Sequence, residues 1–359
     1  MKIIDIAHMP RPQKPAHSLD VPMKPNLFSI ASKELSQDAF LTWFIQWADS
    51  SCEKHNPGLH AAGAQFLLQL ISLQGTPPQQ ITSVKAYRQW ANIDIWVVVN
   101  DSHLIIIEDK VGTDQHSDQL ARYRKIGSDW CKTHNAQLIC VYIKTQSDSS
   151  FSRDKVEEQG FAVLNRRGLL ASMEKHSVNN DILADFLDQL RQVESNESQF
   201  TLKKIGEWES PDWKGFYQEL EKRRKIENWG YVNNPSGGFW NAQLNWLTHE
   251  SVFIYMQIEQ GNLCFKVGEV YDNHRAVREH YHGLLVSKAP DDMGLKRPRR
   301  FGNGTYMTIA IIPRPVWLDG DEGTLNFAAV LDRLLRYESW LVETLATAIP
   351  VPMPHTISA

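Results

Sequence analysis

Apolar residues change their spacing along this chain, and the changes separate helices from strands. Between residues 34 and 50 they recur every three or four positions, which predicts a helix with Ser32 as its N-cap. A second helix is predicted over residues 60–73, before a glycine and two prolines break the pattern. The first part of the chain is therefore expected to be helical.

After residue 81 the apolar positions alternate, and the chain becomes rich in β-branched and aromatic residues. This pattern predicts three strands of a meander, over residues 83–90, 93–99 and 103–110. A helix is then expected from about 116 to 133, a buried strand over 136–144, one more strand over 160–165, and helices over 166–176 and 179–195. The order is that of an α/β domain with an α-β-β-β-α-β core.

A polar stretch from Glu194 to Gln199 places a domain boundary between there and Pro211. The following part, residues 207–347, is expected to be an α+β domain with a mainly antiparallel sheet. Its predicted elements are a helix over 213–229, strands over 238–246, 252–259, 263–270 and 305–312, and a closing helix over 325–346. The first domain then spans residues 31–200, preceded by a proline-rich arm, residues 1–30, that packs on the surface or is partly disordered.

The composition is that of a globular protein and indicates no particular activity. The chain has 359 residues, 42% of them hydrophobic, and a net charge of -4, so a nucleic-acid partner would need local basic patches. No apolar run is long enough for a bilayer span, and the four cysteines are scattered without metal-ligand spacing. We therefore expect a cytoplasmic protein with no membrane partner.

Charged residues at the end of one predicted strand carry the candidate chemistry. On a strand, Glu108 and Lys110 share one face and Asp109 points to the other. If residues 100–102 form a three-residue loop, Asp94 on the preceding strand lies directly opposite Glu108, whereas a two-residue loop would put it on the wrong face. The prediction therefore includes a register that a structure can check.

Two carboxylates beside one ammonium suit a divalent cation that offsets their charge. Mg²⁺ binds a few carboxylate and carbonyl oxygens together with water and phosphate, so Asp94, Glu108 and the Asp109 backbone carbonyl are candidate ligands. The cation would activate a bound water and polarise a phosphate, while Lys110 orients the water or stabilises developing negative charge. The alternative is a solvated salt bridge at an exposed strand end, which stabilises little.

These residues resemble the PD-(D/E)xK nuclease superfamily, with Ile93-Asp94 followed by Glu108-Asp109-Lys110 and isoleucine in place of the usual proline. Roughly residues 30–195 are similar to a bacterial branch with a Glu-Leu-Ser helix, an N-I-D-I strand, an E-x-K strand and a Q-L-x-x-Y helix. Those pieces appear here at residues 34–36, 92–95, 105–110 and 119–123. The second domain also looks like the C-terminal part of these proteins.

The resemblance implies a restriction-endonuclease-like core in which Asp94 and Glu108 bind Mg²⁺ or Mn²⁺ and Lys110 is the catalytic lysine. It also implies supporting roles for Glu34, near the metal or a water, and for Gln119, which positions water or substrate. Both side chains have ordinary explanations, since Glu34 suits the first turn of a helix and an exposed glutamine needs no function. The implied activity is metal-dependent hydrolysis of phosphodiester bonds, in DNA by analogy, in phage defence or DNA repair.

The sequence offers one candidate substrate-binding surface and several alternative functions. Four basic residues in one segment are the best local candidates for phosphate contacts, although a solvated loop explains them equally well: Lys296, Arg297, Arg299 and Arg300. The main alternative function is a catalytically silent module that binds nucleic acid or protein within a larger complex. An RNase, a structure-specific nuclease or a triggered toxin would share the same residues, and a homo-oligomer or a defence-system protein is a candidate partner.

Overall fold

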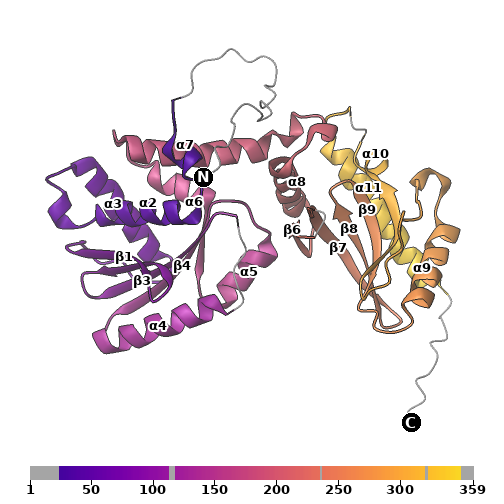
Figure 1. The fold of residues 1–359 in the computed structure, drawn as a ribbon, viewed down its shortest axis with the longest axis horizontal. Helices are drawn as coiled ribbons and strands as arrows, with labels where there is room; N and C mark the ends of the chain where they lie inside the picture. The colour runs from indigo at the N-terminus through magenta and orange to yellow at the C-terminus, as the bar shows by residue number, and fades with distance from the viewer. Residues whose placement is uncertain (1–23, 113–117, 235–236, 320–321, 349–359) are drawn as a thin grey trace, which may run out of the picture.

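The computed structural model describes residues 24–112, 118–234, 237–319 and 322–348. In this part of the chain two five-stranded sheets form two units, joined through the long helix α7 (Figure 1). No helix among these residues combines the length and the apolar character that a membrane crossing requires.

The first unit contains a mixed sheet of strand order β1-β2-β3-β4-β5. Its strands are β1 (Val84–Trp90), β2 (Ile93–Val99), β3 (His103–Lys110), β4 (Gln137–Lys144) and β5 (Ala162–Asn165). Its helices are α1 (Leu27–Ile30), α2 (Glu34–Gln46), α3 (Pro57–Ser72), α4 (Gln119–His134), α5 (Ser150–Glu158), α6 (Arg166–Met173) and α7 (Asp181–Ser198). The predicted α/β class and the order of the core elements are confirmed.

The register between β2 and β3 places the charged residues as predicted. Val99 pairs with His103, so the loop between the strands has three residues. The antiparallel ladder then runs to the pair Ile95 and Ile107, and the next positions along the two strands are Asp94 and Glu108. The predicted hairpin register is therefore confirmed, whereas β4 and β5 extend the sheet in the parallel direction.

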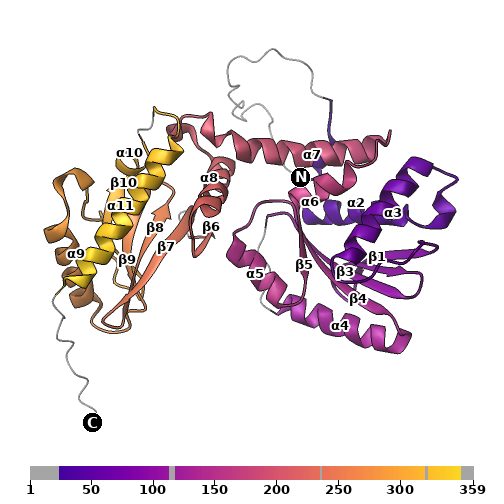
Figure 2. The ribbon, with the colours of Figure 1, turned by 180° about the vertical axis from the view of Figure 1, so that it is seen from behind.

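Both faces of β3 are buried, and each face belongs to a different core. Ile105 and Ile107 pack with α2, α3, α6 and α7, whereas Leu104 and Ile106 pack with α4 (Figures 1 and 2). Since side chains alternate along a strand, Glu108 follows the α4 side of the sheet and Asp109 follows the α2 side. The charged residues therefore emerge where a fully apolar strand ends.

The second unit is built on an antiparallel sheet of order β10-β9-β8-β7-β6. Its strands are β6 (Asn228–Val232), β7 (Phe239–His249), β8 (Val252–Glu259), β9 (Asn262–Gly268) and β10 (Met307–Pro313). Its helices are α8 (Ser210–Arg223), α9 (His274–Lys288), α10 (Arg314–Trp317) and α11 (Phe327–Ala346). Apolar residues of α8, α9 and α11 form one core with the sheet, in agreement with the predicted α+β arrangement.

Two local predictions need correction. Lys33, without a side-chain hydrogen bond, is the N-cap of α2 in place of Ser32. The helix predicted over 213–229 ends at Arg223, because Asn228 starts the edge strand β6 by pairing with β7. The polar stretch from Glu194 belongs to the end of α7, where its glutamates form partly or fully buried ion pairs.

Two further expectations concern the ends of predicted segments. Of the N-terminal arm, residues 24–30 pack on α7: Phe28 is buried between Phe40 and Phe186, and the Leu27 amide donates to Asp185. Residues 1–23 of the arm, and the start of the helix predicted from residue 116, lie outside the described residues. The short helices α1 and α5 were not predicted from the sequence.

Candidate active site

The candidate site lies where β2 begins and β3 ends. One carboxylate oxygen of Asp94 accepts a hydrogen bond of 3.0 Å from the backbone N–H of Asp109. This bond links the Asp94 side chain to β3 after the last ladder pair. The position of Asp94 is therefore set by the hairpin and by a backbone donor, and it does not depend on a flexible side-chain partner.

The Lys110 ammonium occupies the centre of the group of charges. Its Nζ atom lies 2.5 Å from Glu108, 3.8 Å from Asp94 and 3.9 Å from Glu34, measured to a carboxylate oxygen in each case. It also donates to the Asp109 carbonyl oxygen at 3.3 Å. Three carboxylates and a carbonyl thus surround one cation, which identifies the place where positive charge is most strongly stabilised.

Glu108 is the most buried of these carboxylates, with an exposed fraction of 0%. No group among the described residues donates a well-formed hydrogen bond to either of its oxygens, and Lys110 contacts it as an ion pair. Burial, followed by repulsion from Asp94, raises the pKa of Glu108 to about 8. A divalent cation would supply the partner that the second oxygen of this buried carboxylate lacks.

The ammonium is held in its charged form by the same contacts. Burial by itself lowers the pKa of Lys110, but the contact with Glu108 and the charges of Asp94 and Glu34 outweigh it and raise the pKa. The lysine is also nearly inaccessible, with an exposed fraction of 8%. Lys110 therefore carries its positive charge at neutral pH within the group of carboxylates.

A second polar group lies on the opposite face of β3 and was missed in the sequence. Gln37 donates to Asp109 Oδ1 at 2.6 Å and accepts from the Thr145 hydroxyl at 3.1 Å. Burial raises the pKa of the neighbouring Asp38 to about 7, and that of Asp109 well above its usual range. The signal was available, because residues three and four positions after Glu34 share its helix face.

Of the two predicted supporting residues, Glu34 reaches the site and Gln119 does not. Glu34, the first residue of α2, accepts from the backbone N–H of Val111 at 3.2 Å in addition to facing Lys110. Gln119 instead donates to the Tyr123 hydroxyl at 2.8 Å, and Tyr123 donates to the Asn92 carbonyl. Gln119 therefore contacts the start of β2 through Tyr123, and within the described residues it makes no contact with Asp94 or Glu108.

The basic segment lies at the far edge of the second unit. Lys296 forms a bridge with Ile311 of β10, the edge strand opposite to β6. Edge strand β6 is the one that contacts the first unit, where Ser149 donates to Asn228 at 2.8 Å. The four side chains are exposed but are not brought together with the charged group on β3: Lys296, Arg297, Arg299 and Arg300.

The donor set at the end of β3 fits a hard divalent cation. In the described ranges no three His, Cys, Asp or Glu side chains by themselves form a metal-binding group. A cation here would be held by two carboxylates, from Asp94 and Glu108, and by the Asp109 carbonyl. Water and substrate phosphate would complete the shell, as Mg²⁺ prefers. The orphaned oxygens of Glu108 support this fit.

Comparison with known proteins agrees with this geometry. The family model described as "PD-(D/E)XK nuclease superfamily" matches residues 25–204, which is half of the chain. The chain belongs to the PD-(D/E)XK nuclease superfamily. Comparisons with curated proteins and with solved structures gave no match.

The nuclease superfamily match covers the whole mixed sheet and its helices. It includes Asp94, Glu108 and Lys110 and ends at residue 204, before α8. Membership supports a nuclease-type function for the first unit, whose sheet and helices are consistent with a restriction-endonuclease-like fold. The second unit lies outside the matched residues, so the family gives no function for it.

Proposed function

We propose that this protein hydrolyses phosphodiester bonds in DNA with Mg²⁺ or Mn²⁺ as cofactor. The observation that carries the proposal is the convergence of Asp94, Glu108 and Lys110 at the end of β3. There the Lys110 ammonium contacts one oxygen of the fully buried Glu108 carboxylate, and the other oxygen has no partner among the described residues. A solvated salt bridge does not explain this arrangement, because a buried carboxylate oxygen without a partner costs free energy.

Each residue has a separate task in this proposal. A bound cation would supply a water of lowered pKa and would polarise the scissile phosphate. Asp94, fixed by the Asp109 N–H, and Glu108, fixed by burial, hold the cation between them. The Lys110 ammonium stabilises the negative charge that develops on the phosphate, and Glu34 keeps this ammonium next to the carboxylates.

The second unit is proposed to bind substrate or a partner protein. We divide the chain into an arm (residues 1–30), a nuclease-like domain (31–200) and this C-terminal α+β domain (207–347). Phage defence and DNA repair are both settings in which a DNA-cutting enzyme with an added binding domain is useful. A second copy of the chain or a defence-system protein is a candidate partner.

Cleavage assays on defined substrates test the proposed activity. Purified protein is incubated with linear, circular and single-stranded DNA and with RNA, in Mg²⁺, Mn²⁺ or EDTA. We expect DNA cleavage in either metal, none in EDTA, and none by Glu108→Ala. The matched control Glu158→Ala removes an exposed carboxylate of α5 and is expected to cut like wild type.

The outcomes separate the competing functions. Cleavage by Glu108→Ala at the wild-type rate would assign the activity to a contaminant and overturn the proposal. Cleavage of RNA alone would replace the substrate class, since the metal chemistry is the same. Absence of cleavage with retained nucleic-acid binding would favour the silent binding module.

A further inference from the structure

A groove runs between the two units, beside the candidate active site. Its volume is about 200 Å³, and it lies between the segment after β4 and the edge strand β6. The residues that form it include Gly112, which is two positions after Lys110, and Gln146 from the first unit. From the second unit they include Lys214, Tyr231 and Trp240.

Backbone hydrogen bonds connect this groove to the end of the catalytic strand. The Thr145 amide donates to the Lys110 carbonyl at 3.1 Å, and the Gln146 amide donates to the Val111 carbonyl at 3.0 Å. The Gln146 side chain also lies against Gly112, where a Cβ atom would come within 2.9 Å of its oxygen. A nucleic-acid strand bound at Lys110 would therefore lie close to the groove.

Lys214 gives the groove a partly buried positive charge. Its ammonium donates to Gln146 Oε1 at 2.5 Å and lies 5.1 Å from the centre of the Trp240 ring. Burial lowers its pKa. In the part of the chain that the structure describes, no carboxylate oxygen lies within 4.0 Å of it. Glu197 and Asp148, which also lines the groove, attract this ammonium only from a greater distance. A bound anion would therefore give a partly buried ammonium the direct partner that it lacks.

The walls of the groove offer what a nucleobase requires. Tyr231 and Trp240 lie with their ring centres 5.4 Å apart, and Tyr231 is 43% exposed. Aromatic faces of this kind stack on bases. Asn228, Asn241 and Gln243 also line the groove, and amides bind the polar edges of bases. Asn228 and Asn241 already hydrogen-bond to Ser149 and to the Gly230 carbonyl, so a base would meet Gln243 first.

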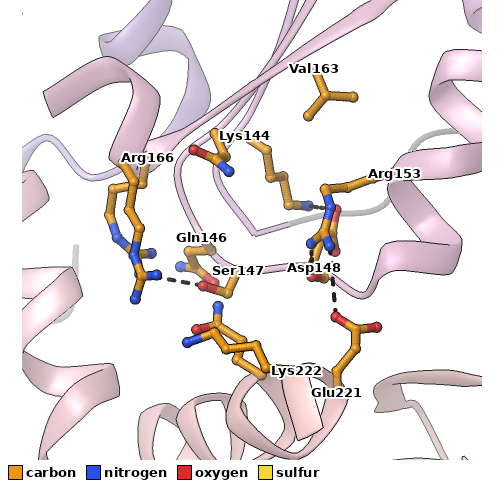
Figure 3. Close-up of a pocket in the computed structure, with 12 residues that line it drawn as sticks. Lys144, Gln146, Ser147, Asp148, Arg153, Val163, Arg166, Glu221 and Lys222 are labelled. Carbon is orange, nitrogen blue, oxygen red and sulfur yellow. Dashed lines mark hydrogen bonds and ion pairs between the residues drawn. The ribbon is translucent and has the colours of Figure 1, made fainter. Parts of the chain in front are cut away.

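A neighbouring cavity of about 240 Å³ is less suited to an anion, although it contains more basic residues (Figure 3). Its cations already have carboxylate partners. Arg153 faces Glu221 at 3.7 Å, and Arg166 contacts Glu194 and Glu197 at 2.7 Å. The charge in this cavity is balanced, so the groove beside Lys214 is the better anion site.

We propose that this groove holds a nucleotide of the substrate strand next to the scissile phosphate. Lys214 binds its phosphate, and the Tyr231–Trp240 pair together with the amides faces its base. The inference rests on the proposed nuclease function and assigns a substrate contact to the second unit.

Binding measurements on the full chain test this groove. Fluorescence anisotropy is recorded with a labelled single-stranded 15-nucleotide DNA in EDTA, over a range of salt concentrations. Lys214→Gln is expected to weaken binding roughly tenfold and to reduce the salt slope by about 0.7, as for one lost phosphate contact. Tyr231→Ala, at an exposed position, is expected to weaken binding by a similar factor without changing the salt slope.

The matched control is Lys222→Gln, which removes an exposed lysine of the neighbouring cavity and is expected to bind DNA as wild type does. A second readout uses DNA that contains 5-iodouracil: after irradiation, mass spectrometry is expected to find cross-links at Tyr231 or Trp240. Unchanged binding by both groove variants, or cross-links confined to residues 296–300, overturns the inference. That result would leave the proposed metal-dependent cleavage unaffected. Conversely, DNA binding that depends on the groove, without any cleavage, would overturn only the proposed catalysis.

Discussion

Replacing Glu108 by glutamine is expected to stabilise the metal-free protein at alkaline pH while it abolishes cleavage. Glu108 is fully buried, and its pKa is raised from 4.5 to about 8, first by burial and then by Asp94. An acid whose pKa is raised on folding binds its proton more tightly in the folded state. The contribution of Glu108 to wild-type stability is therefore fully present below about pH 4.5 and is lost as the pH rises towards 8.

The size of this effect follows from the same pKa. One pKa unit corresponds to about 1.36 kcal/mol, so complete ionisation would cost about 5 kcal/mol, and partial relaxation around the charge reduces this. We expect Glu108→Gln to gain roughly 2–4 kcal/mol over wild type between pH 5 and pH 8.5. A new amide without partners would cost free energy at every pH, so the change with pH isolates the contribution of ionisation.

The assay is urea unfolding in EDTA, followed by tryptophan fluorescence at several pH values. Glu34→Gln is the matched control, because Glu34 faces the same lysine but its side chain is 32% exposed; its effect should stay within about 1 kcal/mol and change little with pH. A Glu108→Gln difference that is flat between pH 5 and pH 8.5 would refute the reasoning, since it would show that Glu108 ionises like an exposed carboxyl.

Three further predictions concern the scaffold. Asp38→Asn is expected to raise the free energy of unfolding in EDTA by roughly 2–4 kcal/mol at pH 8 and by little at pH 4, because burial raises the pKa of Asp38 to about 7; equal effects at both pH values would contradict this. Gly215→Ala should destabilise the protein by about 1–3 kcal/mol or more, since the new Cβ would lie 1.8 Å from the Glu197 carbonyl oxygen. Gly283→Ala, which has open space around it in α9, should instead stabilise the protein by about 0.5–1 kcal/mol. Thermal unfolding of the two variants compares these effects. Arg166→Ala should cost about 3–5 kcal/mol, because it leaves Glu197 buried without its cation, and a loss below 1 kcal/mol in urea unfolding would show that water replaces the arginine.

The hairpin of β2 and β3 could be predicted from sequence because strand periodicity and loop length together determine its register. Three residues between Val99 and His103 are enough to bring Asp94 opposite Glu108, and the structure shows the same register up to the preceding pair, Ile95 and Ile107. The same alternation placed Asp109 on the other face. Local patterns therefore gave the backbone geometry of the candidate site.

The polar partners of Asp109 could not be predicted in the same way. Gln37 and Thr145 meet Asp109 only because α2 and the end of β4 pack against β3 from distant parts of the chain. The surroundings of Gln119 depend on the fold in the same way. Its spacing from Tyr123 was correct, but the hydrogen bond between the two side chains turns the amide towards the start of β2.

The contact between the two units was also beyond the sequence. Lys214 lies in an amphipathic helix, and nothing in that pattern distinguishes it from a solvated lysine. Its importance comes from Gln146 and Trp240, which the fold brings to it from two different sheets. The four basic residues at 296–300 were prominent in the sequence, yet the fold places them at the far edge of the second unit.

The most direct test of the central claim is the single-turnover cleavage rate of Lys110→Ala at saturating Mg²⁺, on the DNA that wild type cuts best. Lys125→Ala, which removes an exposed lysine of α4, is the matched control. If Asp94, Glu108 and Lys110 form the catalytic centre, Lys110→Ala should lose at least about 100-fold in rate while Lys125→Ala cuts normally. A folded Lys110→Ala protein that cleaves DNA at the wild-type rate would contradict the account.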